Sequence, residues 1–546
     1  MEVFRPKFFD LLKDGSIKKT FSKDILAGIV VGIVAIPLAI AFAVASGVAP
    51  GKGIITAVIG GFIISFLGGS RVQIGGPTGA FIVIVFGIIR EYGMGGMMVA
   101  TVMAGIILIC FGLLRLGTLL KYIPHPLIVG FTSGIAVVIL TTQIPAALGL
   151  ETGELPGSFI GKWGAYLKNA GSLNFFAAGT TILTISIILL TPKITRRIPG
   201  SFLAIVLVTP LVYFFFPGSV VTIGSLYGDI GFSFNPELPA VDWANIGNYI
   251  QPAITIAMLG AIESLLSAVV ADGMIGDSHR SNTELIAQGI ANAVVPFFGG
   301  IPATGAIART ATNVKNGGRT PLAGMMHAVF LLLIMFFFGS WASLIPMSCL
   351  AGILIVVAYN MSEWRNFVSV LKGSFFDIII LLITFLLTVL VDLTVAIQIG
   401  VVLAALLFMK RMADNAPSVI NSLDEDVAGI YKNIPANIGI YEISGPFFFA
   451  SAKVYSETIR EIGLEYRVVI IRMRHVPFVD ATGIKNLKDT VKFLRSKDTN
   501  IILSGVRAGV RKDLDKFGVS ELVGEKRIYS KFEEALEAAV RSSKEV

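Results

Sequence analysis

Long apolar stretches fill most of residues 25–411. Eleven of them are long enough to span a membrane, where a helix needs roughly 20 residues to cross about 30 Å of hydrocarbon; they cover 25–48, 53–70, 95–119, 125–148, 174–192, 200–217, 251–272, 320–341, 343–361, 374–391 and 393–411. Three more apolar segments, 76–90, 283–299 and 302–313, are short or interrupted by glycine and proline. The pattern predicts an α-helical polytopic membrane protein with fourteen segments.

An internal repeat divides these segments into two halves. Thr-Gly-Ala opens the third segment at residues 78–80 and recurs 226 residues later at 304–306, where it opens the tenth. Seven segments per half is an odd number, so the halves are expected to be inverted. Paired glycine- and proline-interrupted segments in such halves indicate a binding site near the midplane of a secondary transporter. A chance match of three small residues is the alternative interpretation.

The two short segments predict an anion site. A helix that starts inside the membrane leaves its first N–H groups without intrahelical partners and carries about half a positive charge there. Two such ends can bind an anion between them, with Gly79 and Gly305 allowing close approach to the backbone. Thr78 and Thr304 supply hydroxyl groups. The alternative is that these glycines only allow helices to pack closely.

Two charges lie well inside predicted segments. Glu263 is in the middle of the eighth segment, and Arg309 is about one and a half turns into the tenth. An unpaired charge at the bilayer centre costs at least about 2.5–3.5 kcal/mol, so both side chains are expected to face protein or water. Arg309 would add positive charge to the anion site. A structural salt bridge between the two is the alternative.

The C-terminal region has a different pattern. Strands are predicted over 438–449, 467–473 and 501–503, and amphipathic helices over 451–462, 484–494 and 532–540. This alternation predicts a small α/β domain over 436–546, joined to the membrane domain of 25–411 by a linker over 412–435. The domain lacks phosphate-binding or catalytic motifs, so we expect neither enzyme activity nor a cofactor.

Composition and charge agree with this division. The chain is 54% hydrophobic and 15% charged, with a mean hydropathy of +0.79. Residues 1–411 carry 24 Lys/Arg and 17 Asp/Glu, whereas the remaining 135 carry 20 and 19. The positive excess lies mainly in the N-terminal tail, 1–24, and in alternate short loops. This predicts a protein of the plasma or inner membrane with both termini in the cytoplasm, and argues against a nucleic-acid partner. Cys110 and Cys349 lie in apolar runs and predict neither a disulfide nor a metal site.

Four motifs in this order resemble the sulfate permease (SulP) family of anion transporters: IPLAIAFA at 36–43, GGPTGAF at 75–81, GAIES at 260–264 and GIPATGAIART at 300–310. The tail resembles the sulfate transporter and anti-sigma antagonist (STAS) domain of that family. The resemblance implies 7+7 inverted repeats like those of uracil permeases, divided into a core and a gate. It also implies a homodimer in membrane lipid, and substrates such as sulfate, bicarbonate or dicarboxylates.

By motif match, the resemblance implies which residues bind the anion. They are Phe42, Thr78, Gly79, Ala303, Thr304 and Gly305, with Arg309 nearby and with Glu263 and Ser267 as the ion-coupling pair. Sodium-coupled bicarbonate transporters of the family tend to carry Asp and Thr at the last two positions. This chain has Glu263 and Ser267, which argues against sodium coupling. An anion bound beside a carboxyl inside a span favours the protonated carboxyl, so we expect proton symport by alternating access and no metal. A sodium-coupled bicarbonate transporter, an uncoupled anion channel and a receptor that signals through the STAS domain are the alternatives.

Overall fold

The computed structural model describes residues 4–118, 124–153, 155–195, 198–228, 236, 243–391, 393–414, 418–420, 434–435 and 437–544. Internal contacts divide the chain into two compact units, with the division after Val401. We call them the membrane unit and the STAS unit. The predicted boundaries at residues 24, 411 and 435 remain predictions, and most of the predicted linker lies outside the described residues.

The first half of the membrane unit contains seven segments where seven are predicted. They are α2 (Ser16–Ala45); α3 (Pro50–Ile55), η1 (Thr56–Gly60) and α4 (Gly61–Leu67) together; the two parts of η2 (Gly79–Phe81) and α5 (Ile82–Leu113); α6 (His125–Leu148); α8 (Phe175–Ile194); and α9 (Gly200–Phe215). Gly93, with φ 69° and ψ −176°, breaks α5 between the third and fourth segments. Only glycine adopts this conformation easily, so a single residue separates two segments that otherwise form one helix.

The second half repeats this plan. It contains α11 (Ile250–Ile275), α12 (Ser281–Val294), α13 (Ile307–Lys315), α14 (Leu322–Phe338), α15 (Met347–Met361), α17 (Phe375–Leu390) and the start of α18 (Leu393–Asp414). The division between the two units falls within α18, after Val401. Shorter helices lie between or before the segments: α1 (Lys7–Lys13), α7 (Phe159–Lys168), α10 (Ile223–Tyr227), η5 (Trp243–Tyr249) and α16 (Trp364–Val370). Nine helical stretches among the described residues are long and apolar enough to cross a membrane.

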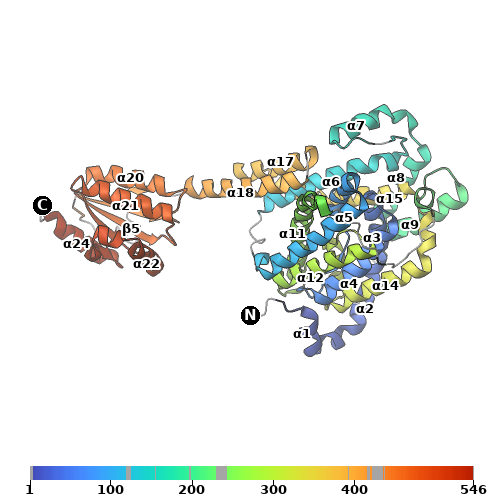
Figure 1. The fold of residues 1–546 in the computed structure, drawn as a ribbon, viewed down its shortest axis with the longest axis horizontal. Coiled ribbons are helices and arrows are strands. Elements are labelled where there is room, and N and C mark those ends of the chain that lie inside the picture. The colour runs from blue at the N-terminus through green and yellow to red at the C-terminus, as the bar shows by residue number, and fades with distance from the viewer. Residues whose placement is uncertain are drawn as a thin grey trace. The chain divides into compact units, whose positions relative to one another are not determined.

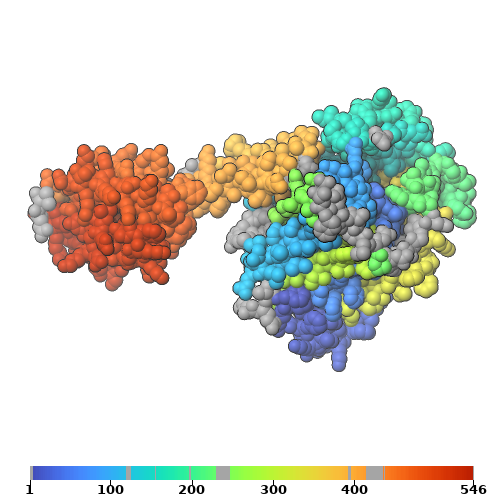
Figure 2. Space-filling view, viewed as in Figure 1, coloured from blue at the N-terminus to red at the C-terminus, as the bar shows by residue number. Residues whose placement is uncertain are grey.

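Packing between the segments follows the inverted repeat. The first segment, α2, packs against α14, the eleventh, and the eighth, α11, packs against α5, which contains the fourth. Likewise α6 packs against α17, and its counterpart α15 packs against α8. The helices α5 and α12 lie side by side across the face seen in Figures 1 and 2. Each half therefore completes the core of the other.

The STAS unit contains a five-stranded sheet in the order β3-β4-β5-β6-β7. Its strands are β3 (Ser418–Ile420), β4 (Ile438–Ser444), β5 (Val468–His475), β6 (Asn500–Ser504) and β7 (Ile528–Tyr529), with β3 antiparallel to β4 and the others parallel. The helices are α20 (Ala452–Glu465), α21 (Ala481–Arg495), α22 (Ala508–Lys516), α23 (Val519–Val523) and α24 (Phe532–Lys544). Side chains of α20–α23 and of α24 form separate apolar clusters with alternate strand residues, so helices cover both faces of the sheet.

Three details differ from the sequence analysis. The first membrane helix begins at Ser16 rather than at residue 25, and α1 precedes it. The strand predicted over 438–449 ends at Ser444, because Gly445 has φ 115° and Pro446 follows it. The edge strands β3 and β7 and the helices α22 and α23 were not predicted. The missed strands and helices are short, so their apolar patterns are too brief to be recognised in the sequence.

Candidate functional site

Two unwound segments, one from each half, meet inside the membrane unit. Gly75–Gly76 (β1) pairs antiparallel with Thr304–Gly305 (β2), so that Gly75 lies opposite Gly305 and Gly76 opposite Thr304. The N–H of Ala306 donates to the carbonyl of Ile74 at 2.8 Å, which extends the pairing. Without water, interrupted helices need such partners for their backbone groups. The Thr-Gly-Ala repeats therefore lie close together, although they are 226 residues apart.

The third segment begins where the repeat predicts. Thr78 has extended backbone angles and Gly79 opens the helix. The N–H groups of Gly79 and Ala80 have no hydrogen-bond partner among the described residues. They are free donors at the positive end of a helix.

The tenth segment begins two residues later than the repeat predicts. Its helix α13 starts at Ile307, because the N–H of Gly305 already donates to Ser264 Oγ at 3.1 Å. The first helical hydrogen bond runs from Thr310 N–H to the carbonyl of Ala306. Residues 307–309 therefore hold the unpartnered N–H groups at this end, within the described chain. The expectation that the tenth helix starts at its Thr-Gly-Ala is therefore wrong for this conformation, and the N–H of Gly305 is not one of its free donors.

Polar side chains on α11 hold the place where the two unwound segments pair, which we call the crossing. Ser264 Oγ lies 2.7 Å from Thr304 Oγ1, which also donates to the carbonyl of Gly260 at 3.1 Å. Ser267 Oγ lies 3.2 Å from Thr310 Oγ1, which accepts from the N–H of Ile74. Thr304 and Ser267 are fully buried. Both therefore stabilise the crossing as it stands.

Glu263 lies on the same face of α11, one turn before Ser267. Its carboxyl faces Thr78, and the side chain keeps some accessible surface deep within the span. The hydroxyl of Thr78 is buried, and this carboxyl is the one hydrogen-bonding neighbour that it has among the described residues. A carboxyl, the hydroxyl that it faces and two free N–H groups therefore lie at the start of the third segment.

Arg309 is buried and its guanidinium donates to the carbonyl of Pro77. A Cβ on Gly76 would lie 2.5 Å from Arg309 Nη1, so the guanidinium lies directly against this glycine of the paired strand. Glu263 and Arg309 are both described and form no ion pair with each other. The salt-bridge alternative is thus absent from this conformation, and Arg309 binds the unwound turn just before Thr78.

An apolar wall surrounds Gly79. A Cβ at this position would lie 2.9 Å from Met361 Sδ, 3.5 Å from Phe42 Cε1 and 3.6 Å from Ile139 Cδ1. Phe42 is therefore beside Gly79, as the motif match predicts. Met361 and Ile139 come from α15 and α6, which carry no recognisable motif there.

Ala303 lies in a different environment. It packs with Ile64 and Ala291, and the side chain of Asn292 bonds both its N–H, at 2.9 Å, and its carbonyl, at 2.8 Å. The nine predicted residues therefore form two groups. Phe42, Thr78, Gly79 and Glu263 surround the free donors of the third segment, whereas Ala303, Thr304, Gly305, Ser267 and Arg309 hold the crossing in place.

Three buried ionisable residues escaped the sequence analysis. Asp24 and Glu284 are fully buried and bind backbone N–H groups of the opposite half. His327 is fully buried in α14, and neither ring nitrogen has a partner among the described residues. A rule that every charge or histidine inside an apolar run is notable would have found Glu284 and His327. Asp24 lies in a region interpreted as a tail.

The arrangement can bind a small anion through backbone dipoles and hydroxyls, with a carboxyl alongside that can carry a proton. Among the described residues, no group of three or more His, Cys, Asp and Glu side chains could hold a metal ion. One carboxyl with neighbouring hydroxyls is a partial oxygen set, and sodium therefore remains an alternative to the proton.

Comparison with known proteins adds an independent line of evidence. The sulfate permease family model matches residues 21–384, and the STAS domain model matches residues 430–535. YvdB of Bacillus subtilis (strain 168), which is named only as a candidate sulfate transporter, is 40% identical over 531 residues, covering 97% of this chain and 99% of YvdB. The bicarbonate transporter BicA of Picosynechococcus sp. (strain ATCC 27264 / PCC 7002 / PR-6) is 30% identical over 512 residues, covering 89% of each chain.

Solved structures share the fold. Murine Slc26a9, an anion transporter solved in the inward-facing state, has a TM-score of 0.88 at 18% identity, over 98% of this chain and 94% of that one. The transmembrane domain of a cyanobacterial BicA has a TM-score of 0.63 at 30% identity, over 69% of this chain and 97% of that one. With 67% of its length matched by one family model and an inverted, interrupted-helix core, the chain belongs to the sulfate permease family and carries a STAS domain.

Proposed function

We propose that the chain is a secondary active transporter that takes up a small anion together with a proton by alternating access. The candidate substrates are sulfate, bicarbonate and small dicarboxylates. YvdB and BicA are named for the first two of these anions. The proposed binding site lies at the start of the third segment, between Phe42 and Glu263. A homodimer with both termini in the cytoplasm remains part of the proposal.

One observation carries this proposal. The N–H groups of Gly79 and Ala80 are buried donors without partners among the described residues. The hydroxyl of Thr78 lies beside them and faces the Glu263 carboxyl. A buried donor that lacks a partner costs about 1–3 kcal/mol, and an anion would satisfy both N–H groups at the positive end of a helix. Because these groups recognise charge and size rather than chemical identity, the substrate class is broad.

The coupling follows from the carboxyl. An anion bound at Gly79 would lie beside Glu263, and two negative charges so close in a region of low dielectric repel each other strongly. Binding of the anion and protonation of Glu263 therefore favour each other. Protonation also removes one charge from the step that crosses the membrane, where each charge costs about 2.3 kcal/mol per 100 mV.

The test uses purified full-length protein in proteoliposomes with radiolabelled sulfate and bicarbonate. Inward proton and sodium gradients are imposed separately, each without the other. We expect accumulation with the proton gradient alone, and loss of accumulation but retained anion binding in Glu263→Gln. Glu151→Gln removes an exposed carboxylate from a loop and is the matched control. Accumulation only with sodium would refute proton coupling, and purely downhill flux would identify a channel.

The location of the site is tested by a pair of glycines. A Cβ at Gly79 meets the flexible end of Met361, so Gly79→Ala should fold and bind anion at least tenfold more weakly. A Cβ at Gly305 would collide with the Gln73 amide and lie 3.2 Å from the Ser264 Cα. Gly305→Ala should therefore lower thermal stability first. Unchanged affinity in a folded Gly79→Ala protein would place the anion elsewhere.

A further inference from the structure

A second positively charged region lies away from the proposed transport site, where α1 meets the end of α5 and the start of α12. It surrounds an open cavity of about 970 Å³. Its lining includes Phe4, Phe9 and Lys13 from the N-terminal segment, Arg115 after α5, Arg280 before α12, and the first turn of α12. We call it the α1 cavity.

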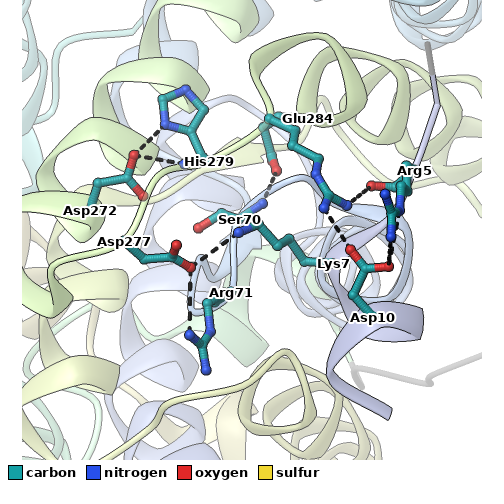
Figure 3. Close-up of polar contacts among 10 residues, drawn as sticks. Arg5, Lys7, Asp10, Ser70, Arg71, Asp272, Asp277, His279 and Glu284 are labelled. Carbon is teal, nitrogen blue, oxygen red and sulfur yellow. Dashed lines mark hydrogen bonds and ion pairs between the residues drawn. The ribbon is translucent and has the colours of Figure 1, made fainter. Parts of the chain in front are cut away.

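The charges of the α1 cavity do not balance. Arg5 and Arg280 both bind the Asp10 carboxylate, at 3.0 and 2.6 Å, and Figure 3 shows this carboxylate between cationic side chains. Partial burial alone would raise the pKa of Asp10, but these two arginines hold that pKa below its ordinary value. Lys13 and Arg115 have no ion-pair partner among the described residues. Four cations therefore face one carboxylate.

Arg115 is held in an unusual conformation. Its φ is 61°, at a position after a helix where glycine is normally preferred. A side chain in this region costs roughly 1–2 kcal/mol. The N-terminal turn of α12, a helix of 14 residues, lines the same cavity and adds its partial positive charge. The partial charge of this helix end and the side-chain charges of the cavity therefore have the same sign.

Exposed apolar side chains flank these cations. Phe9 is 42% exposed and Leu12 is 52% exposed on α1, while Leu113 and Leu114, just before Arg115, are 55% and 69% exposed. In a membrane protein, such side chains at helix ends lie among lipid chains, and basic residues beside them lie at the depth of lipid headgroups. A soluble phosphate compound would leave these apolar groups without a role.

We propose that the α1 cavity binds the phosphate headgroup of an anionic phospholipid, with Lys13 and Arg115 contacting the phosphate and Phe9, Leu12, Leu113 and Leu114 contacting the acyl chains. Basic pockets at the ends of transmembrane helices bind such headgroups in other proteins. The bound lipid would hold α1 against the start of α12. This site is independent of the anion transport site proposed above.

The test uses full-length protein in phosphatidylcholine micelles, to which phosphatidylglycerol is added. Native mass spectrometry counts bound lipid, and thermal unfolding measures its stabilising effect. Each basic residue contributes roughly a fivefold gain in affinity for an anionic surface, so Lys13→Gln with Arg115→Gly should weaken phosphatidylglycerol binding about thirtyfold. Glycine at 115 suits the left-handed conformation, so the fold should be preserved.

The matched control is Lys18→Gln with Lys19→Gln, which removes two exposed cations of α2 that do not line the cavity. It should bind phosphatidylglycerol as the unmodified protein does. Equal binding by the cavity variant and this control would overturn the proposal. Full stabilisation by glycerol 3-phosphate in phosphatidylcholine micelles would overturn the lipid as the ligand and identify a soluble phosphate instead.

Discussion

The two units of this chain stabilise buried charges in different ways. In the membrane unit, Asp24 accepts from the N–H groups of Arg319 and Thr320 at 2.7 and 3.1 Å, and Glu284 accepts from those of Gly69 and Ser70 at 2.8 and 3.2 Å. In the STAS unit, the Glu442 carboxylate instead pairs with side chains of the next strand, Arg472 at 3.1 Å and Arg474 at 2.6 Å.

The cause of the difference is the backbone. Strands β4 and β5 satisfy their own peptide groups through the ladder, so a buried charge there needs another side chain. In the membrane unit, residues 69, 70, 319 and 320 lie in loops outside the helices, so their peptide N–H groups have no intrahelical partner. Asp24 and Glu284 bind such groups, each across the boundary between the halves. Buried charge in the membrane unit therefore holds the two halves together.

The largest effect is expected at Glu284. Glu284→Ala leaves two buried N–H groups and the Gln288 amide without their acceptor, and we expect a loss of about 5 kcal/mol from the unpaired donors and the cavity. Thermal unfolding monitored by size-exclusion fluorescence measures this loss. Glu284→Gln keeps an acceptor and should lose less, and Glu151→Ala should lose nothing. A stable Glu284→Ala protein would contradict the capping role.

A smaller effect, confined to one unit, is expected at Glu442. Glu442→Ala leaves Arg472 buried without its partner, although this guanidinium also stacks over Phe532 at 4.5 Å. Breaking a buried pair costs about 3–5 kcal/mol, and the stacking should place the loss near the lower limit. Hydrogen exchange should increase in β4 and β5 but not in α11 or α13. Anion binding should persist, as it should after truncation near residue 412.

The smallest effect is expected at Asp10, where charges pair at the surface of the membrane unit. Its pKa lies below the ordinary 3.8 in the folded protein, so its stabilising contribution is complete above pH 3.8 and is lost as pH falls through the lower folded value. For an exposed pair this contribution is about 0.5 kcal/mol. Hydrogen exchange of residues 7–13 should therefore accelerate as the pH falls below the pKa of Asp10 in the folded protein. Asp10→Asn should show the fast exchange already at pH 7.

Much of the architecture follows from the sequence. Apolar length predicted the membrane helices, and a repeated Thr-Gly-Ala located the two interrupted ones, because spans and breaks are local properties of the chain. The STAS unit was recognisable because strand and helix periods differ. Short elements such as α1 and β7 were missed, since two to seven residues contain too little of either period.

Only the tertiary structure determines which hydrogen-bond donors and acceptors of the membrane core pair with each other. The sequence places Gly305 and Arg309 near the proposed anion site, but only the fold gives the N–H of Gly305 to Ser264 and the guanidinium of Arg309 to the carbonyl of Pro77. It likewise buries Asp24 against residues 319 and 320. These partners are between 41 and 296 residues apart, and no local pattern encodes which donor meets which acceptor when two inverted halves pack together.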